Sequence, residues 1–123
     1  MHEEIQGLWF CPSPEVPGEL DYYHFDTSGK VVTFTPLPPE LGLGRQLMAI
    51  AYRTEPEGET GFRLRLRSQD SWQHMQYHLV SGLLTIYDDR GHEWKFSQVP
   101  ETEIPPWFEE RLTEEHRKLE ERL

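Results

Sequence analysis

The feature that most constrains the fold of this chain is a series of eight short runs in which apolar and polar residues alternate. The runs cover residues 5–11, 20–25, 30–35, 47–53, 62–67, 72–80, 83–87 and 92–99. Alternation with a period of two places successive side chains on opposite faces of a β-strand. Clusters of glycine, proline and aspartate separate the runs. Many short strands separated by turn residues are typical of β-barrels and β-sandwiches.

The alternation is clearest in residues 62–67. The apolar members of this run are Phe62, Leu64 and Leu66, and the polar members are Arg63, Arg65 and Arg67. A buried, unpaired guanidinium group would cost several kcal/mol, so the two sets cannot exchange places. We therefore predict that the apolar side chains face a core and that the arginines face solvent beside acidic neighbours.

Turn residues indicate how the runs are joined. The segment 26–29 reads Asp-Thr-Ser-Gly, and Gly29 can adopt the positive φ that a tight hairpin needs. Ser81-Gly82 and the segment 88–91 indicate two later turns of the same kind. Residues 36–44 are rich in proline and glycine and too numerous for a tight turn, so we predict an open loop there.

A single sheet of eight strands can bury one apolar face only if the sheet folds over itself. We therefore predict a mainly β fold, an eight-stranded antiparallel up-and-down barrel over residues 1–100. A two-sheet sandwich would bury the same face and stays open as the alternative.

The periodicity changes after Pro105. Apolar residues at 108, 112, 119 and 123 form one narrow stripe on a helix, which we predict over residues 106–122. A helix with one apolar stripe must dock on something. We expect the segment 101–123 to pack on the barrel or on a partner, so both a monomer and a homodimer are open.

A tripeptide in the first run, Gly7-Leu8-Trp9, resembles the Gly-x-Trp motif in the first strand of lipocalins and other calycins. The segments 23–31 and 84–96 are similar to hairpins of small bacterial lipocalin-like proteins. The resemblance covers about residues 5–98 and implies an eight-stranded up-and-down barrel. It also implies that Trp9 closes the barrel floor beneath a basic side chain, for which Arg90 and Lys95 are candidates.

Composition argues against several classes of partner. With 22 acidic and 12 basic residues the formal net charge is −10, which repels nucleic-acid phosphates and anionic lipids. Cys11 is the only cysteine, which excludes an intramolecular disulfide, and we expect it to pack as a small hydrophobic residue. The acidic start is not followed by an apolar run of signal-peptide length, so we expect a cytoplasmic protein without membrane contact.

The sequence contains no catalytic or metal-binding motif that we can identify. His74 and His78 stand four residues apart on one strand, roughly 13 Å, which is too far for both to bind one ion. The pair Asp88 and Asp89 fits a turn as well as it fits acid and base chemistry. We therefore expect no cofactor and no metal, and an enzyme is the least favoured class.

The leading hypothesis is a non-catalytic barrel that binds a small apolar or aromatic ligand. The residues that we expect to line its interior or mouth are Tyr23, Phe25, Phe34, Met48, Tyr52 and Tyr77. The alternative is a protein-interaction module or homodimer that uses the helix and a barrel face and binds no ligand.

Overall fold

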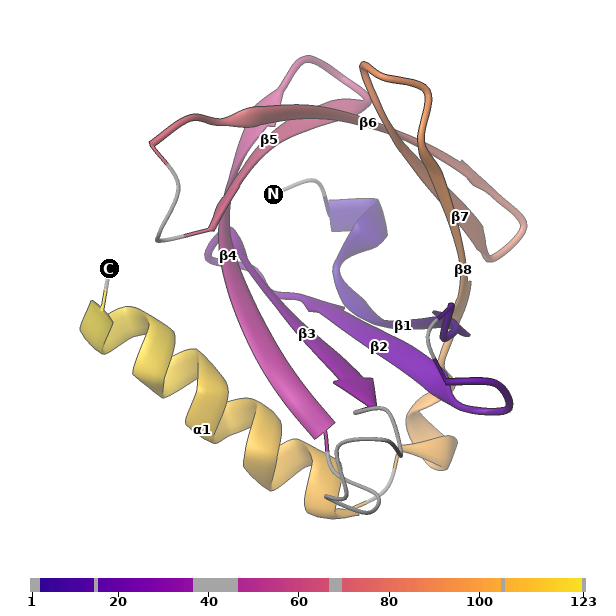
Figure 1. Ribbon diagram of the computed structural model, residues 1–123, viewed down its shortest axis with the longest axis vertical. Coiled ribbons are helices and arrows are strands. Elements are labelled where there is room, and N and C mark those ends of the chain that lie inside the picture. Colours follow the sequence, from indigo (N-terminus) through magenta and orange to yellow (C-terminus); the bar gives the residue numbers. More distant parts are fainter. Residues whose placement is uncertain (1–2, 15, 37–46, 67–69, 105, 123) are drawn as a thin grey trace.

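The computed structural model describes residues 3–14, 16–36, 47–66, 70–104 and 106–122 (Figure 1). Its eight strands are β1 (Gly7–Pro12), β2 (Leu20–Phe25), β3 (Lys30–Pro36), β4 (Leu47–Glu57), β5 (Gly61–Leu66), β6 (Gln73–Val80), β7 (Leu83–Asp88) and β8 (Glu93–Gln98). Each strand coincides with one of the eight alternating runs to within a few residues. Of the predicted loop 36–44, only Pro36 lies among the described residues, and it belongs to β3.

The strands form a closed antiparallel barrel in which each strand pairs with the next along the chain. The first and last strands complete the ring, because Trp9 pairs with Gln98 and Phe10 with Ser97. Figure 1 shows the strands encircling a central space. The prediction of an eight-stranded up-and-down barrel is therefore confirmed, and the two-sheet sandwich is excluded.

Side-chain alternation on β5 sets the inner and outer faces as predicted. Phe62 is buried inside the barrel and Leu64 packs against the same core. On the outer face Arg63 forms an ion pair with Glu55, its register partner on β4. The guanidinium groups of Arg63 and Arg65 also lie 5.3 and 4.8 Å from the ring centre of Trp72. Arg67 lies outside the described residues.

One end of the barrel is closed by the short helix η1 (Glu3–Ile5). Ile5 is fully buried in the interior core, and its carbonyl accepts a hydrogen bond of 2.9 Å from the indole nitrogen of Trp9. Trp9 therefore has the structural role that the resemblance implies. Neither of the two basic residues expected to cover Trp9 does so, because the side chains of Arg90 and Lys95 are exposed to solvent.

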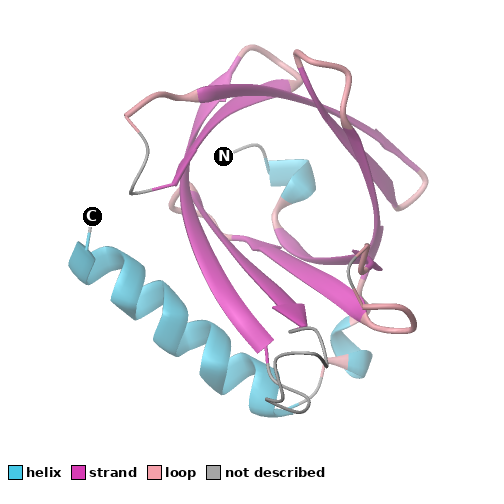
Figure 2. Ribbon diagram, in the orientation of Figure 1, coloured by secondary structure: helices cyan, strands magenta, loops and turns pink. Residues whose placement is uncertain are grey.

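The C-terminal helix α1 (Pro106–Arg122) confirms the predicted bounds and lies along the outside of the barrel (Figure 2). A second short helix, η3 (Glu101–Glu103), precedes it. The buried residues between α1 and the barrel are Leu8, Val32, Phe34 and Phe108. The described residues thus form two apolar clusters, one inside the barrel and one beneath the helix. Among the described residues, no helix is long and apolar enough to cross a membrane.

Candidate ligand-binding site

The barrel interior contains a cavity of about 190 Å³. Its walls come from seven of the eight strands, β2 to β8. The lining residues are Tyr23, Phe25, Val31, Tyr52, Phe62, Leu64, Gln73, Met75, Ile86, Trp94 and Phe96. None of these side chains is charged, and most are apolar or aromatic, so the cavity offers an apolar surface with a few neutral polar groups.

The lining of the cavity is buried in one part and exposed to solvent in another. Phe25, Phe62 and Phe96 are almost completely buried, whereas Gln73 and Trp94 are exposed. The lining therefore meets solvent at Gln73 and Trp94, which gives a small molecule a way in. An apolar cavity of about 150 Å³ is sufficient for benzene, so this one has room for a single ring and a short substituent.

Three of the six residues expected to line the interior or mouth of the barrel do line the cavity: Tyr23, Phe25 and Tyr52. Tyr77 also faces inward, but its hydroxyl donates to the Glu4 carboxylate and so belongs to the closed end of the barrel. Met48 does not line the cavity, and 44% of its surface is exposed. The role of these residues in binding stays a prediction.

Phe34 does not line the interior. It faces outward and is fully buried beneath α1, where its ring centre lies 4.8 Å from that of Phe108. The cause is strand geometry: Val31 lines the cavity, and a residue three positions further along a strand points to the opposite face. Phe34 thus serves helix docking rather than the cavity.

Sequence reasoning missed eight of the lining residues: Val31, Phe62, Leu64, Gln73, Met75, Ile86, Trp94 and Phe96. The signal that could have found most of them was already visible. The alternation in residues 62–67 identifies Phe62 and Leu64 as inward, and the same alternation in residues 92–99 puts Trp94 and Phe96 together on one face. Extending that assignment around all eight strands would have identified the later lining residues.

Three titratable side chains inside the barrel, Cys11, Tyr23 and Tyr52, stay protonated at neutral pH. Burial and, secondarily, the charge of Asp21 raise the pKa of Cys11 to about 11. Burial also raises the pKa of Tyr23 and Tyr52, and the cavity therefore presents neutral phenols. Cys11 is half-buried against the core, as predicted, and its protonated thiol is a weak nucleophile.

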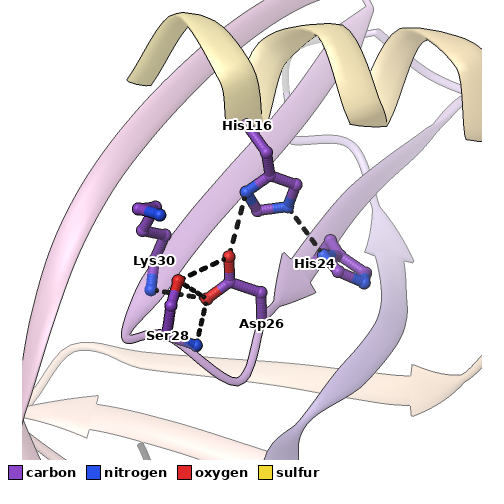
Figure 3. A network of polar contacts seen from close by, with 5 residues as sticks. All are labelled: His24, Asp26, Ser28, Lys30 and His116. Atoms are coloured by element: carbon purple, nitrogen blue, oxygen red, sulfur yellow. Dashed lines mark hydrogen bonds and ion pairs between the residues drawn. The ribbon is translucent and has the colours of Figure 1, made fainter. Parts of the chain in front are cut away.

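A polar network on the outer face anchors α1 to the barrel (Figure 3). His116 of the helix stands between two groups, with Nδ1 3.2 Å from Oδ2 of Asp26 and Nε2 3.0 Å from Nδ1 of His24. Asp26 also accepts hydrogen bonds from the backbone nitrogens of Ser28 and Lys30, at 2.8 and 2.9 Å. The helix is therefore tied to the turn between β2 and β3 as well as packed through Phe108.

Burial has opposite consequences for the two barrel groups of this network. Burial, and after it the neighbouring His116, lower the pKa of His24 to about 4, so His24 is neutral at pH 7. Burial acts to raise the pKa of Asp26, but hydrogen bonds from Lys30 and Ser28 and the proximity of His116 outweigh it. Asp26 consequently stays ionised beside His116 Nδ1.

The histidines singled out for metal binding lie apart in solvent. His74 and His78 are both exposed on the outer face of β6, and His74 Nδ1 is 2.8 Å from Oε2 of Glu57. The carboxylate of Asp88 organises a turn through hydrogen bonds from Arg90 and His92. Across the described part of the chain, no group of three or more His, Cys, Asp or Glu side chains could hold a metal ion.

The architecture, a closed eight-stranded antiparallel barrel with a C-terminal helix, is consistent with a calycin-like fold. Comparison of the sequence with protein-family models and with curated proteins finds no match. The chemistry of the cavity is therefore the basis for a functional proposal.

Proposed function

We propose that the protein is a lipocalin-like barrel that binds a small apolar or aromatic molecule in its interior. The observation that supports this proposal is the cavity of about 190 Å³, walled by apolar and aromatic side chains and reaching solvent at Gln73 and Trp94. Ligand pockets are commonly of this kind, largely apolar with a few polar groups that orient the ligand. Here Tyr23, Tyr52 and Gln73 supply those polar groups.

The test is a titration with phenylpropanol, a neutral probe with about ten non-hydrogen atoms. Methyl-labelled methionine provides the readout, because Met75 lines the cavity and Met48 does not. We expect the Met75 methyl resonance to shift with saturation while the Met48 resonance stays in place. An unmoved Met75 resonance at millimolar probe would contradict the proposal.

A matched pair of substitutions locates the binding site. Leu64 and Leu79 are both inward-facing and half-buried against the core, but only Leu64 lines the cavity. Leu64→Phe should fill the cavity and abolish the Met75 shift, whereas Leu79→Phe should leave it. Each change should cost about 1 to 3 kcal/mol of stability through overpacking, so a difference in binding would not reflect a difference in folding.

The alternative function, a module that binds a protein partner, has less support. Phe108 and Leu112, two members of the apolar stripe on α1, already pack against the barrel. A partner or second copy would have to use other residues. Val80 and Leu83, beside the turn between β6 and β7, are apolar and exposed on the outer face, so they are the candidates for such a contact.

A further inference from the structure

We infer that the ligand of this cavity is a small organic cation, an apolar or aromatic body that carries an amine. The inference rests on the proposed function of the cavity and specifies the class of molecule that it takes. Three features of the described residues support it: an interior without basic groups, a wall of aromatic rings, and a buried carboxylate beside the lining.

The first feature is the absence of a counter-charge for an anion. Among the residues that the structure describes, the lining of the cavity includes no basic side chain. Basic residues on the described strands alternate with cavity-lining ones and so face outward: Lys30 beside Val31, Arg53 beside Tyr52, Arg63 and Arg65 on either side of Leu64, and Lys95 beside Trp94. A carboxylate or phosphate that entered this space would lose its hydration without gaining a positively charged partner among these lining residues.

The second feature is the number of aromatic rings that meet at the cavity. Six of the eleven lining residues are aromatic: Tyr23, Phe25, Tyr52, Phe62, Trp94 and Phe96. The face of an aromatic ring is electron-rich and attracts a cation, and this attraction is stronger where water is excluded. The same chain already uses such contacts on its outer face, where Arg63 and Arg65 lie over Trp72.

The third feature is Asp21, which is 7% exposed. It occupies the next inward-facing position to Tyr23 on β2, opposite Cys11 on β1. Its charge acts on Tyr23 and Cys11, since it contributes to the raised pKa of both. A cation in contact with Tyr23 would therefore experience a favourable potential, and the net charge of −10 would attract it from solution.

Three probes that share one phenylpropyl body test the inference: phenylpropylamine, phenylpropanol and phenylpropionate, which are positive, neutral and negative at pH 7. Calorimetry gives each Kd, and the Met75 methyl resonance shows that each probe occupies the cavity. We expect the amine to bind tightest and the carboxylate at least about tenfold more weakly than the amine. Because this comparison uses the unaltered protein, it does not depend on a variant that folds.

A variant then assigns the charge preference to Asp21. Asp21→Asn preserves the shape of the side chain and removes its charge, so it should weaken amine binding about threefold or more and leave phenylpropanol binding unchanged. Asp89→Asn is the matched control, because it removes the same charge from an exposed turn. Equal effects of the two substitutions on amine binding would contradict a local role for Asp21.

The outcomes separate the two levels of the argument. If phenylpropanol or phenylpropionate binds tightest and still shifts the Met75 resonance, the inference of a cationic ligand is overturned while the proposed function stands. If none of the probes shifts that resonance, the proposed function fails, and the inference fails with it.

Discussion

Two hairpin turns of the barrel share one local structure and differ in what surrounds them. The first connects β2 to β3 and the second connects β7 to β8. In each, an aspartate, Asp26 or Asp88, donates its backbone N–H to the carbonyl four residues later, at 2.9 and 3.1 Å. Its Oδ1 accepts the backbone N–H groups two and four residues later. Gly29 and Gly91, three residues after each aspartate, have φ of 85° and 89°.

The difference lies at the second carboxylate oxygen. Oδ2 of Asp88 contacts His92, which belongs to the same turn and whose side chain is 66% exposed. Oδ2 of Asp26 contacts His116, which comes from α1 and whose side chain is only 16% exposed. The same local sequence pattern thus makes a self-contained turn in one place and a helix anchor in the other, and the distinction comes entirely from a distant segment of the chain.

The largest expected difference between the turns is at their glycines. A Cβ atom on Gly29 would lie 2.9 Å from the backbone oxygen of Thr54, whereas one on Gly91 would meet no atom within 4 Å. Gly29→Ala should therefore lower the free energy of unfolding by about 2 to 4 kcal/mol, through both positive φ and a backbone clash. Gly91→Ala should cost about 1 to 2 kcal/mol from positive φ alone. Urea denaturation measures both, and equal losses would show that the Thr54 contact is relieved without cost.

Removing the aspartates gives the next largest difference. Asp26→Ala eliminates the backbone hydrogen bonds of the turn and the contact with His116, and it should cost about 2 to 3 kcal/mol. Asp88→Ala eliminates the same turn bonds but detaches no helix, so its loss in urea denaturation should be smaller. A loss for Asp88→Ala as large as that for Asp26→Ala would mean that the helix contact contributes nothing.

Acid should destabilise the protein through the helix anchor. Unfolded His24 takes up a proton near its ordinary pKa of 6.5, but folded His24 does so only near 4. Between these values the unfolded state binds more protons, so stability is full above about pH 6.5 and falls as the pH decreases towards 4. We expect a loss of about 1 to 2 kcal/mol, allowing for the partial exposure of the ring. The lowered pKa of Asp26 adds a further loss only below its ordinary value of 3.8.

Thermal unfolding across this pH range, followed by circular dichroism, measures the effect. His24→Gln should remove most of the decline, whereas His92→Gln, in the exposed turn, should keep it. A decline that persists unchanged in His24→Gln would assign the acid sensitivity to other groups.

The smallest expected difference concerns the two turn histidines themselves. His116→Ala should cost about 1 kcal/mol, because it removes a partly buried contact with Asp26 and leaves His24 without its partner. His92→Ala should produce no measurable change, since exposed ion pairs contribute little. Denaturant midpoints of the two variants test this, and indistinguishable midpoints would show that the apolar contacts of Phe108 and Leu112 hold the helix without His116.

Local sequence patterns were sufficient to predict the strands, the turns and the helix. Alternation in residues 62–67 assigned Phe62 to the inside and Arg63 to the outside because a strand has only two faces. The aspartate and glycine residues of segment 26–29 indicated the first of the two turns discussed above. Closure of the barrel then followed from the need to bury one apolar face.

The cavity and the helix anchor were predicted less completely. Phe34 was assigned to the interior because of its residue type, although its position relative to Val31 indicates the outer face. The contact between His24 and His116 spans 92 positions in the sequence, and neither histidine stands in a pattern that indicates the other. Local patterns describe faces and turns, whereas a pairing across the fold depends on where the helix docks.

The barrel is a rolled sheet whose two edge strands, β1 and β8, meet at a short junction. This junction has two register pairs, whereas every other neighbouring pair of strands has four to seven. A hydrogen bond from the Val99 backbone N–H to the Leu8 carbonyl extends it. The junction also joins the segments that are furthest apart along the chain, so its formation has the largest loop-closure entropy cost of any strand pairing. The junction between β1 and β8 should therefore form late in folding and open first in the native state. Hydrogen exchange measures this, because the amide protons of Phe10 and Val99 should then exchange with solvent before those of β3 and β4.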